Sequence, residues 1–426
     1  MCREWAQHPD GQLPAYEWAF GDVNPPVHAW AAWQVYRNDG SWDRKFLVRV
    51  FGKLLINFTW WVNRKDADGS NLFEGGFLGM DNIGLFDRSE AVPGGFRLEQ
   101  SDATSWMGFF CLSMLRIALE LAREDDAWDD LCTSMLERFV AINRATNTFG
   151  HAGAALWDDE DGFFYDTLVS EDAARVEQVR VRSLVGLLPL LAVASVPSWV
   201  DEDLPDFTAR VLWLRRNVPD DAEPIMDFSG WGDTSMTLSL VHAEWYPRML
   251  ARLLDEGEFL SPYGIRSLSA AYRDGVTLDV AGTSMELRYD PAESTSGLFG
   301  GNSNWRGPVW FPVNVLLADA LETYAEGAGA DLTVECPTGS GRLLPLKEVA
   351  VEIDRRLISL FRPRADGRRP SDPADHGTGP LWEAHPVFSE YFHGDVGRGL
   401  GASHQTGWTA LVAHLVCTKG RATPLD

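Results

Sequence analysis

Apolar residues recur at helical spacing along most of this chain. Between residues 42 and 61, for example, Phe46, Val50, Leu54 and Phe58 mark one face of a helix. The same periodicity predicts helices over residues 27–37, 42–61, 103–123 (with Asp102 as N-cap), 127–146, 179–194, 205–214, 239–254, 307–327, 344–361 and 405–416. Strand-like alternation is limited to two hairpins, over residues 157–166 and 275–289.

The pattern predicts an all-α fold. Its helices form hairpins with short connections, and its strands occur only as small excursions in the loops. Because the loops carry the unusual residues, the pattern favours an (α/α) toroid of helical hairpins. Heptads and repeats of fixed period are absent from the sequence, which disfavours a coiled-coil bundle.

Composition narrows the class of protein further. The 426 residues, 45% of them hydrophobic, are enough for a large core, and the net charge of −25 disfavours nucleic acid and anionic membranes as partners. No apolar run approaches ~18 residues, so no membrane span is predicted. The start has no apolar signal core, and the five scattered cysteines suggest buried free thiols in the cytoplasm.

The 18 tryptophans are the unusual feature of the composition. An indole offers a flat apolar face that matches the C–H face of a sugar, while carboxylates and amides bind sugar hydroxyls. We expect about half of the tryptophans to fill the core. The others, which lie in loops together with Asp and Glu, indicate a carbohydrate ligand.

The stretch Gly75–Ser89 combines four glycines with six large apolar residues. Such a loop is expected to line a cavity, where the carboxyl group of Asp81 would resist ionisation and could protonate a leaving group. The alternative from residue type alone is that Asp81 braces a turn.

The second stretch, residues 291–314, is a Gly-rich loop that leads into a helix. Asn304 and Arg306 are donors suited to sugar hydroxyls, and Trp305 offers a stacking face. A Gly-rich loop before an ordinary helix start is the alternative.

The third stretch, residues 388–409, places Glu390 among aromatic residues. Hydrolysis of a glycosidic bond needs one acid for the leaving oxygen and one base for water, and Asp81 with Glu390 could supply them if the fold brings them together. A surface Glu at a loop edge is the alternative.

These three stretches, in this order, resemble glycoside hydrolase family 63, and most closely its bacterial members and the mannosylglycerate-hydrolase-like catalytic domain. The resemblance rests on Gly-Gly-Phe-Leu-Gly-Met-Asp-Asn (75–82), Gly-Asn-Ser-Asn-Trp-Arg-Gly-Pro-Val-Trp (301–310) and Glu-Tyr-Phe-His-Gly-Asp-Val-Gly-Arg-Gly-Leu-Gly-Ala (390–402), with smaller matches at 17–29 and 259–269. It covers nearly the whole chain and implies a single catalytic domain over residues 1–426.

The resemblance implies an (α/α)6 barrel and hydrolysis with inversion, with Asp81 as general acid and Glu390 as general base. Their carboxyl groups should then lie ~6.5–9.5 Å apart. It places Trp305 and Arg306 in the pocket wall. The weaker pocket candidates are Trp18, Asn24 and Arg266.

No cofactor is expected, because the carboxylates suffice. The oxygen-rich loop over residues 66–74 resembles part of a Ca²⁺ site, although a solvated turn is the favoured interpretation. His28, His393 and His404 are expected to be hydrogen-bonding wall residues.

The sequence thus favours an inverting α-glycosidase that acts on a glucoside or mannoside. A sugar epimerase or isomerase on a similar toroid, which would use pairs of histidines, and an inactive sugar-binding relative are the alternatives.

Only two predicted helices precede the acid loop, whereas about eight follow it. Family 63 members commonly carry an N-terminal β-sandwich, and this chain shows no β-rich leader. The asymmetry suggests that the toroid lacks its first helices, which a missing N-terminal segment would supply. Leu47, Leu54 and Phe58 would then lose packing partners and form an apolar patch.

Overall fold

Helices form most of the regular structure in the computed structural model. It describes residues 7–15, 20, 23–63, 79–80, 82–85, 92, 94–147, 155–170, 172, 174–231, 235–295, 303–375, 377 and 379–418. The α-helices are α1 (His28–Asn38), α2 (Arg44–Asn63), α3 (Ser101–Ala122), α4 (Asp129–Asn147), α5 (Val200–Asp203), α6 (Pro205–Asn217), α7 (Pro219–Ala222), α8 (Tyr246–Leu253), α9 (Phe311–Ala325), α10 (Leu346–Ser359), α11 (Pro380–Ala384), α12 (Thr406–Thr409) and α13 (Leu411–Thr418).

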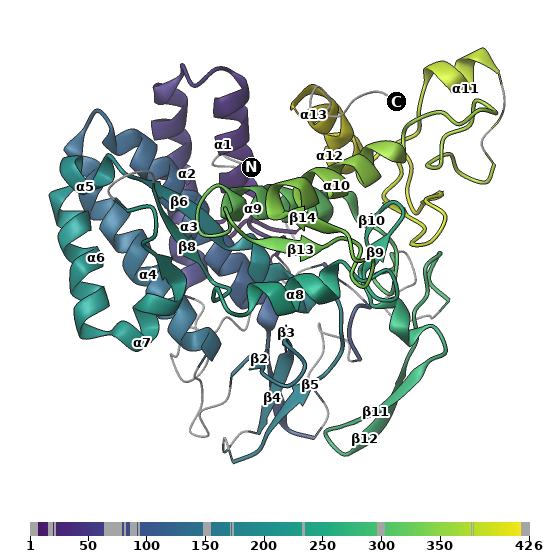
Figure 1. The fold of residues 1–426 in the computed structure, drawn as a ribbon, viewed down its shortest axis with the longest axis horizontal. Coiled ribbons are helices and arrows are strands. Elements are labelled where there is room, and N and C mark those ends of the chain that lie inside the picture. Colours follow the sequence, from purple (N-terminus) through teal and green to yellow (C-terminus); the bar gives the residue numbers. More distant parts are fainter. Residues whose placement is uncertain are drawn as a thin grey trace.

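The strands are short and are grouped in small antiparallel sheets. They are β1 (Phe96–Glu99), β2 (Trp157–Asp158), β3 (Phe163–Phe164), β4 (Asp166–Ser170), β5 (Val176–Val179), β6 (Val193–Pro197), β7 (Met226–Asp227), β8 (Ser235–Ser239), β9 (Leu260–Ser261), β10 (Gly264–Ile265), β11 (Val276–Val280), β12 (Thr283–Leu287), β13 (Thr333–Glu335), β14 (Leu343–Pro345), β15 (Tyr391–Phe392) and β16 (Gly399–Leu400). Sheets β1-β4-β5 and β6-β8-β7 have three strands each. In Figure 1 the β4–β5 and β11–β12 hairpins project below the helices. The predicted helical fold with β excursions is therefore present.

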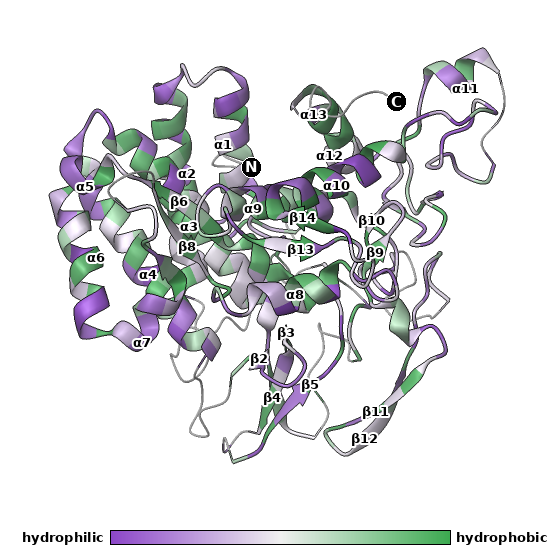
Figure 2. Ribbon diagram, in the orientation of Figure 1, coloured by the Kyte–Doolittle hydropathy of each residue, from purple (hydrophilic) through white to green (hydrophobic). Residues whose placement is uncertain are grey.

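Helix α3 is the centre of the core. All its residues except Arg116 and Glu120 are buried, and it packs against α1, α2, α4 and β6. By length and composition α3 could cross a membrane, but 89% of its most apolar 18-residue window is buried inside the protein. Among the described residues no other helix passes that test. Strands β6 and β8 beside it are hydrophobic, whereas the outlying α7 is hydrophilic (Figure 2).

The prediction that Leu47, Leu54 and Phe58 lack packing partners is wrong. Each of these side chains is at most 1% exposed, because the face of α2 that carries them packs against α1 and α3. The exposed apolar residues of this helix, Val48 and Ile56, lie on its other face. The ring of twelve helices remains a prediction.

Two predicted helices are largely wrong. Residues 184–191 form the 3-10 helices η3 (Leu184–Gly186) and η4 (Leu188–Leu191), and β6 follows. This run is buried on all sides, so its apolar residues carry no amphipathic period, and Pro189 interrupts α-helical hydrogen bonding. In the segment 239–254 the helix begins only at Tyr246, where Pro247 occupies a first-turn position.

Smaller predictions are confirmed or corrected locally. Both hairpins form, as β2–β3 and β11–β12. Helix α3 begins at Ser101, so Asp102 lies in its first turn and is not the N-cap. Cys111, Cys132 and Cys336 are buried free thiols, but Cys417 is exposed; Cys2 lies outside the described residues.

Candidate active site

The first and second sequence motifs meet through two buried asparagines. Asn82 follows Asp81 in the chain, and its amide nitrogen donates to Asn304 Oδ1 at 3.2 Å. The Asn82 side-chain oxygen accepts from the backbone N–H of Trp305 at 2.7 Å. Both asparagines are at most 1% exposed, and 222 residues separate them, so only the fold brings the motifs together. Asp81 itself lies outside the described residues.

Asn304 and Arg306 hold the two loops together through hydrogen bonds to backbone carbonyl oxygens, an arrangement called the loop clamp below. The amide nitrogen of Asn304 donates to the carbonyl oxygens of Asp290 and Ala292, each at 2.8 Å. Arg306 Nε donates to the carbonyl oxygen of Asn82 at 2.8 Å. Its Nη2 atom donates to the carbonyl of Gly84 at 3.1 Å. Both predicted sugar-binding residues therefore hold backbone segments in place.

The third motif joins the second through backbone and aromatic contacts. Val309 and Phe392 exchange both backbone hydrogen bonds, at 2.8 and 3.0 Å. The Trp310 ring stacks on Tyr391 at 4.8 Å between centroids, next to Glu390. The described parts of all three predicted motifs thus converge on one region, at the start of α9.

Glu390 and a second glutamate share one loop. Glu390 Oε2 accepts from the backbone N–H of Ala402 at 3.0 Å. Glu293 Oε1 accepts from the preceding N–H, of Gly401, at 3.3 Å, and its Oε2 accepts from the Tyr391 hydroxyl at 3.1 Å. Burial and the nearby Glu293 carboxylate raise the pKa of Tyr391. Glu293 was not among the predicted site residues, although its position in the second motif was a signal.

Gly401 shows why this loop needs a glycine. Its φ is +67°, and an added Cβ would lie 2.7 Å from Glu390 Oε2 and 2.6 Å from the Tyr391 ring. Any larger residue would displace the Glu390 carboxylate, so the close approach of backbone and carboxylate is built into the loop.

The expected stacking face of Trp305 is not open in this structure. Trp305 is only 4% exposed, and its ring lies on Trp310 with a centroid distance of 3.7 Å and an interplanar angle of 2°. Protein therefore covers one face of the ring, and the role of Trp305 in sugar binding stays a prediction. Its buried indole N–H, however, has no hydrogen-bond partner among the described residues.

Arg266 is buried and committed to protein groups. Nε donates to the Tyr289 hydroxyl at 3.0 Å, and Nη2 donates to Asp395 Oδ1 at 3.2 Å. Nη1 donates to the carbonyl oxygens of Glu256, Glu258 and Leu260. This arginine therefore fixes the floor beside the third motif and presents no open face to a substrate.

The remaining candidates differ in burial. Asn24 is exposed and donates to the carbonyl of Ala15 at 3.1 Å. His393 is half-buried and accepts from the backbone N–H of Asp395, whereas His404 is exposed. His28 is buried against Phe110, and burial lowers its pKa to about 4, while the Asn57 side chain opposes the shift.

Trp18 and the 66–74 loop lie outside the described residues. Within the described residues no cluster of three or more His, Cys, Asp or Glu side chains could hold a metal ion.

A cavity of about 350 Å³ lies against the two clamped loops. It is lined by Asn82, Arg273, Arg288, Tyr289, Asp290, Pro291, Ser294, Thr295 and Arg306. Asn82 and Arg306 thus connect this cavity with the meeting point of the motifs. Its size suits a small ligand.

Comparison with known proteins gives the same family. Residues 4–203 match the family model of the mannosylglycerate hydrolase MGH1-like glycoside hydrolase domain. The chain is 47% identical over 443 residues to the uncharacterized protein YMR196W of Saccharomyces cerevisiae. It is 27% identical over 387 residues to the mannosyl-oligosaccharide glucosidase of the same yeast. These alignments cover 99% and 90% of this chain but 40% and 32% of the relatives, so the chain spans less than half their length.

Two similar solved structures come from the bacterium Thermus thermophilus. An uncharacterized conserved protein has a TM-score of 0.53 and 18% identity, with 97% of this chain and 85% of that chain covered. GH63 mannosylglycerate hydrolase in complex with glucose has a TM-score of 0.51 at the same identity and coverage. At this identity the likeness shows the fold alone. The family-model match over residues 4–203 agrees with the resemblance predicted from the sequence.

Proposed function

On the premise that this chain is related to the family 63 glycoside hydrolases, we propose that it hydrolyses an α-linked glucoside or mannoside with inversion. The observation that carries the proposal is the convergence of the three motifs. Hydrogen bonds of Asn82 and Asn304 tie the loop after Asp81 to the second motif, and Trp310 links that motif to the Glu390 loop. Glycosidic hydrolysis requires two carboxyl groups, and we propose Asp81 of the first motif and Glu390 of the third motif for these roles.

In the proposed reaction the two carboxyl groups have different roles. Asp81 stands in the sequence between Met80 and Asn82, whose side chains are both buried. It donates its proton to the leaving glycosidic oxygen as the C–O bond breaks. Glu390 removes a proton from a water molecule, whose oxygen bonds to the anomeric carbon from the opposite face. Asp81 ends as a carboxylate and Glu390 as an acid, and proton exchange with solvent restores both.

The substrate class follows from the relatives. One relative is named for a glucosidase activity and one structural neighbour for mannosylglycerate hydrolysis, so α-glucosides and α-mannosides are the first compounds to test. The arginine-lined cavity beside the site would suit an aglycone with hydroxyl or acidic groups. We further propose that the protein acts in the cytoplasm.

The test is a panel of α-linked glucosides, mannosides and their glycerate glycosides. Reducing sugar should be released from at least one of them, and NMR recorded during the reaction should show β-anomer as the first product. A first product with α configuration would overturn inversion. Interconversion of free sugars without hydrolysis would support the epimerase alternative, and binding without turnover would support the inactive one.

A further inference from the structure

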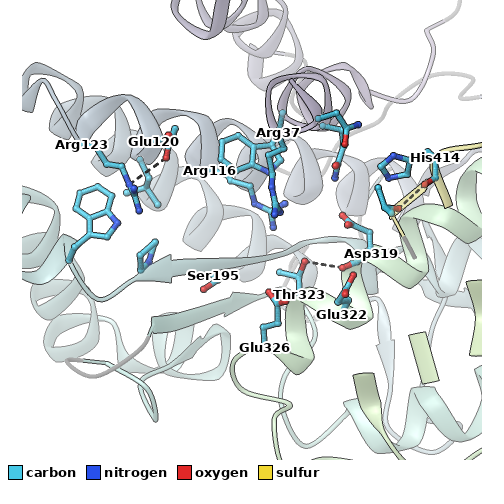
Figure 3. Close-up of a pocket in the computed structure, with 17 residues that line it drawn as sticks. Arg37, Arg116, Glu120, Arg123, Ser195, Asp319, Glu322, Thr323, Glu326 and His414 are labelled. Atoms are coloured by element: carbon cyan, nitrogen blue, oxygen red, sulfur yellow. Dashed lines mark hydrogen bonds and ion pairs between the residues drawn. The ribbon is translucent and has the colours of Figure 1, made fainter. Parts of the chain in front are cut away.

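A second cavity, of about 460 Å³, lies at the other end of α9 from the candidate active site. Helix α9 begins at Phe311, next to Trp310, and the cavity is lined by its later residues, from Asp319 to Glu326. Eight residues of helix separate Phe311 from Asp319, which corresponds to roughly 12 Å. The other walls come from α1, α3, β6 and α13 (Figure 3). The cavity is therefore separate from the loops that carry the three motifs.

Arg116 is the unusual residue of this cavity. It stands on α3, where every other residue except Glu120 is buried, and its guanidinium group points into the cavity (Figure 3). A guanidinium in such a setting normally makes several hydrogen bonds, because burying an unpaired charge is costly. Arg116 makes no hydrogen bond or ion pair within the part of the chain that the structure describes.

Arg37, from the last turn of α1, enters the same cavity beside Arg116 (Figure 3). Among the described residues its guanidinium likewise makes no hydrogen bond or ion pair. Burial lowers the pKa of Arg116; Asp319 opposes this shift and Arg37 adds to it. Glu326 opposes the shift as well, so two carboxylates lie near the two guanidinium groups, although neither forms an ion pair with them among the described residues.

Two of the acidic residues that line the cavity are hydrogen-bonded to other side chains. Glu120 accepts from the Tyr36 hydroxyl at 3.0 Å and forms an ion pair with Arg123 at 3.4 Å. Asp319 accepts from the indole N–H of Trp30 at 2.8 Å. The side of the cavity formed by α1 and α3 therefore presents the guanidinium groups of Arg37 and Arg116, while Glu326 supplies acceptor oxygens at the end of α9.

We propose that this cavity binds a phosphate group, held between the guanidinium groups of Arg116 and Arg37. A phosphate dianion matches two positive charges, and guanidinium forks bind its oxygens in pairs. The cavity has room for more than one phosphate, and Glu326 at the end of α9 offers a carboxylate to hydroxyl groups. The ligand is therefore either inorganic phosphate or the phosphate ester of a small polyol. This proposal does not rest on the proposed glycosidase activity.

Calorimetric titration of the whole chain tests the proposal, with inorganic phosphate and glycerol phosphate as probes and sodium chloride at matched ionic strength as control. We expect saturable heat with at least one phosphate probe and none with chloride. Tighter binding of glycerol phosphate would identify the ester form, and equal affinity would identify phosphate itself. Absence of saturable binding by both probes would overturn the proposal.

Three variants locate the binding. Arg116→Met and Arg37→Gln should each weaken phosphate binding by about tenfold or more, because each removes charge-assisted hydrogen bonds. Arg123→Gln is the matched control, since Arg123 lines the cavity but is paired with Glu120, and it should change the affinity by less than about threefold. Arg37 is exposed, so its variant should keep the fold even if Arg116→Met does not. Unchanged affinity in Arg37→Gln, or an equal loss in Arg123→Gln, would show that phosphate binds elsewhere.

Discussion

The two ends of α9 differ in how their buried polar groups are satisfied. Near its start, Arg266 is 5% exposed and donates to a hydroxyl, a carboxylate and three carbonyl oxygens. Near its end, Arg116 faces a cavity and has no such partner among the described residues. An arginine therefore fixes loop geometry in one region, whereas another arginine keeps its hydrogen-bond donors available in the other region.

This difference separates two kinds of site. Catalysis requires groups that are held in place before the substrate arrives, and fully bonded asparagines and arginines provide that rigidity. A binding cavity for a small ion requires donors whose hydrogen bonds are completed only by the ligand. The following predictions test the comparison, from the largest expected effect to the smallest.

The largest effect should come from the two carboxyl groups. Asp81→Asn and Glu390→Gln should each lower kcat by at least ~10²-fold while the circular dichroism spectrum is unchanged, because each removes one proton transfer. Glu293→Gln is the matched control and should cost less, since Glu293 hydrogen-bonds the same loop without being the assigned base. Near-normal turnover of either main variant would refute its assignment. Azide rescue with a product of retained configuration would point to a covalent nucleophile.

Substitution by Met should destabilise the protein much more at Arg266 than at Arg116. Arg266→Met should lower the free energy of unfolding by about 3 kcal/mol, because it leaves buried carbonyl oxygens without donors. Arg116→Met removes no hydrogen bond and should change stability by less than about 1 kcal/mol in phosphate-free buffer. Urea denaturation of both variants measures the two free energies of unfolding. Similar losses of stability would contradict the proposed difference between the two arginines.

The loop clamp should depend on Asn304. Asn304→Ala leaves the N–H of Arg306 and the carbonyls of Asp290 and Ala292 without that partner, so we expect about 2–3 kcal/mol of destabilisation and a fall in kcat. Asn217→Ala, at an exposed helix end, is the control and should be nearly neutral. A fully active, stable Asn304→Ala protein would show that the motifs do not need this junction.

His28 is an ionisable group that is buried in apolar packing and, unlike Arg116, does not line the 460 Å³ cavity. Burial lowers its pKa from 6.5 to about 4, so the folded state keeps it neutral while the unfolded chain binds a proton below pH 6.5. The contribution of neutral His28 to the free energy of unfolding is therefore fully present above pH 6.5, and about 3 kcal/mol of it is lost as the pH falls through 4. Urea midpoints of His28→Gln should fall less over this range than those of the native protein and of His385→Gln, an exposed control. If the urea midpoints of His28→Gln and of the native protein fell equally with pH, His28 would not be the source of this pH dependence.

The smallest effect should come from Trp305→Phe. The substitution keeps most of the stack on Trp310 but removes the indole N–H that has no partner among the described residues. If that group donates to a substrate hydroxyl, KM should rise by about three- to tenfold with little change in kcat. An unchanged KM would leave Trp305 a packing residue.

Prediction from the sequence succeeded where the signal was local. The amphipathic period identified helices such as α2, α4 and α10, and strand-like alternation over residues 157–166 identified the β2–β3 hairpin. Periodicity failed over residues 184–191, because a run buried on every side has no polar face to reveal its spacing. The three motifs were recognised from residue order alone.

The sequence by itself therefore determined most of the long helices, the family resemblance and the residue types of the candidate site. Only the tertiary structure decided that Asn82 and Asn304 meet, that Trp305 is covered by Trp310, and that Arg266 is fully bonded whereas Arg116 is not. The reason is physical. Helical periodicity is set within a few residues, but burial and hydrogen-bond partners depend on contacts between segments that lie hundreds of residues apart in the chain.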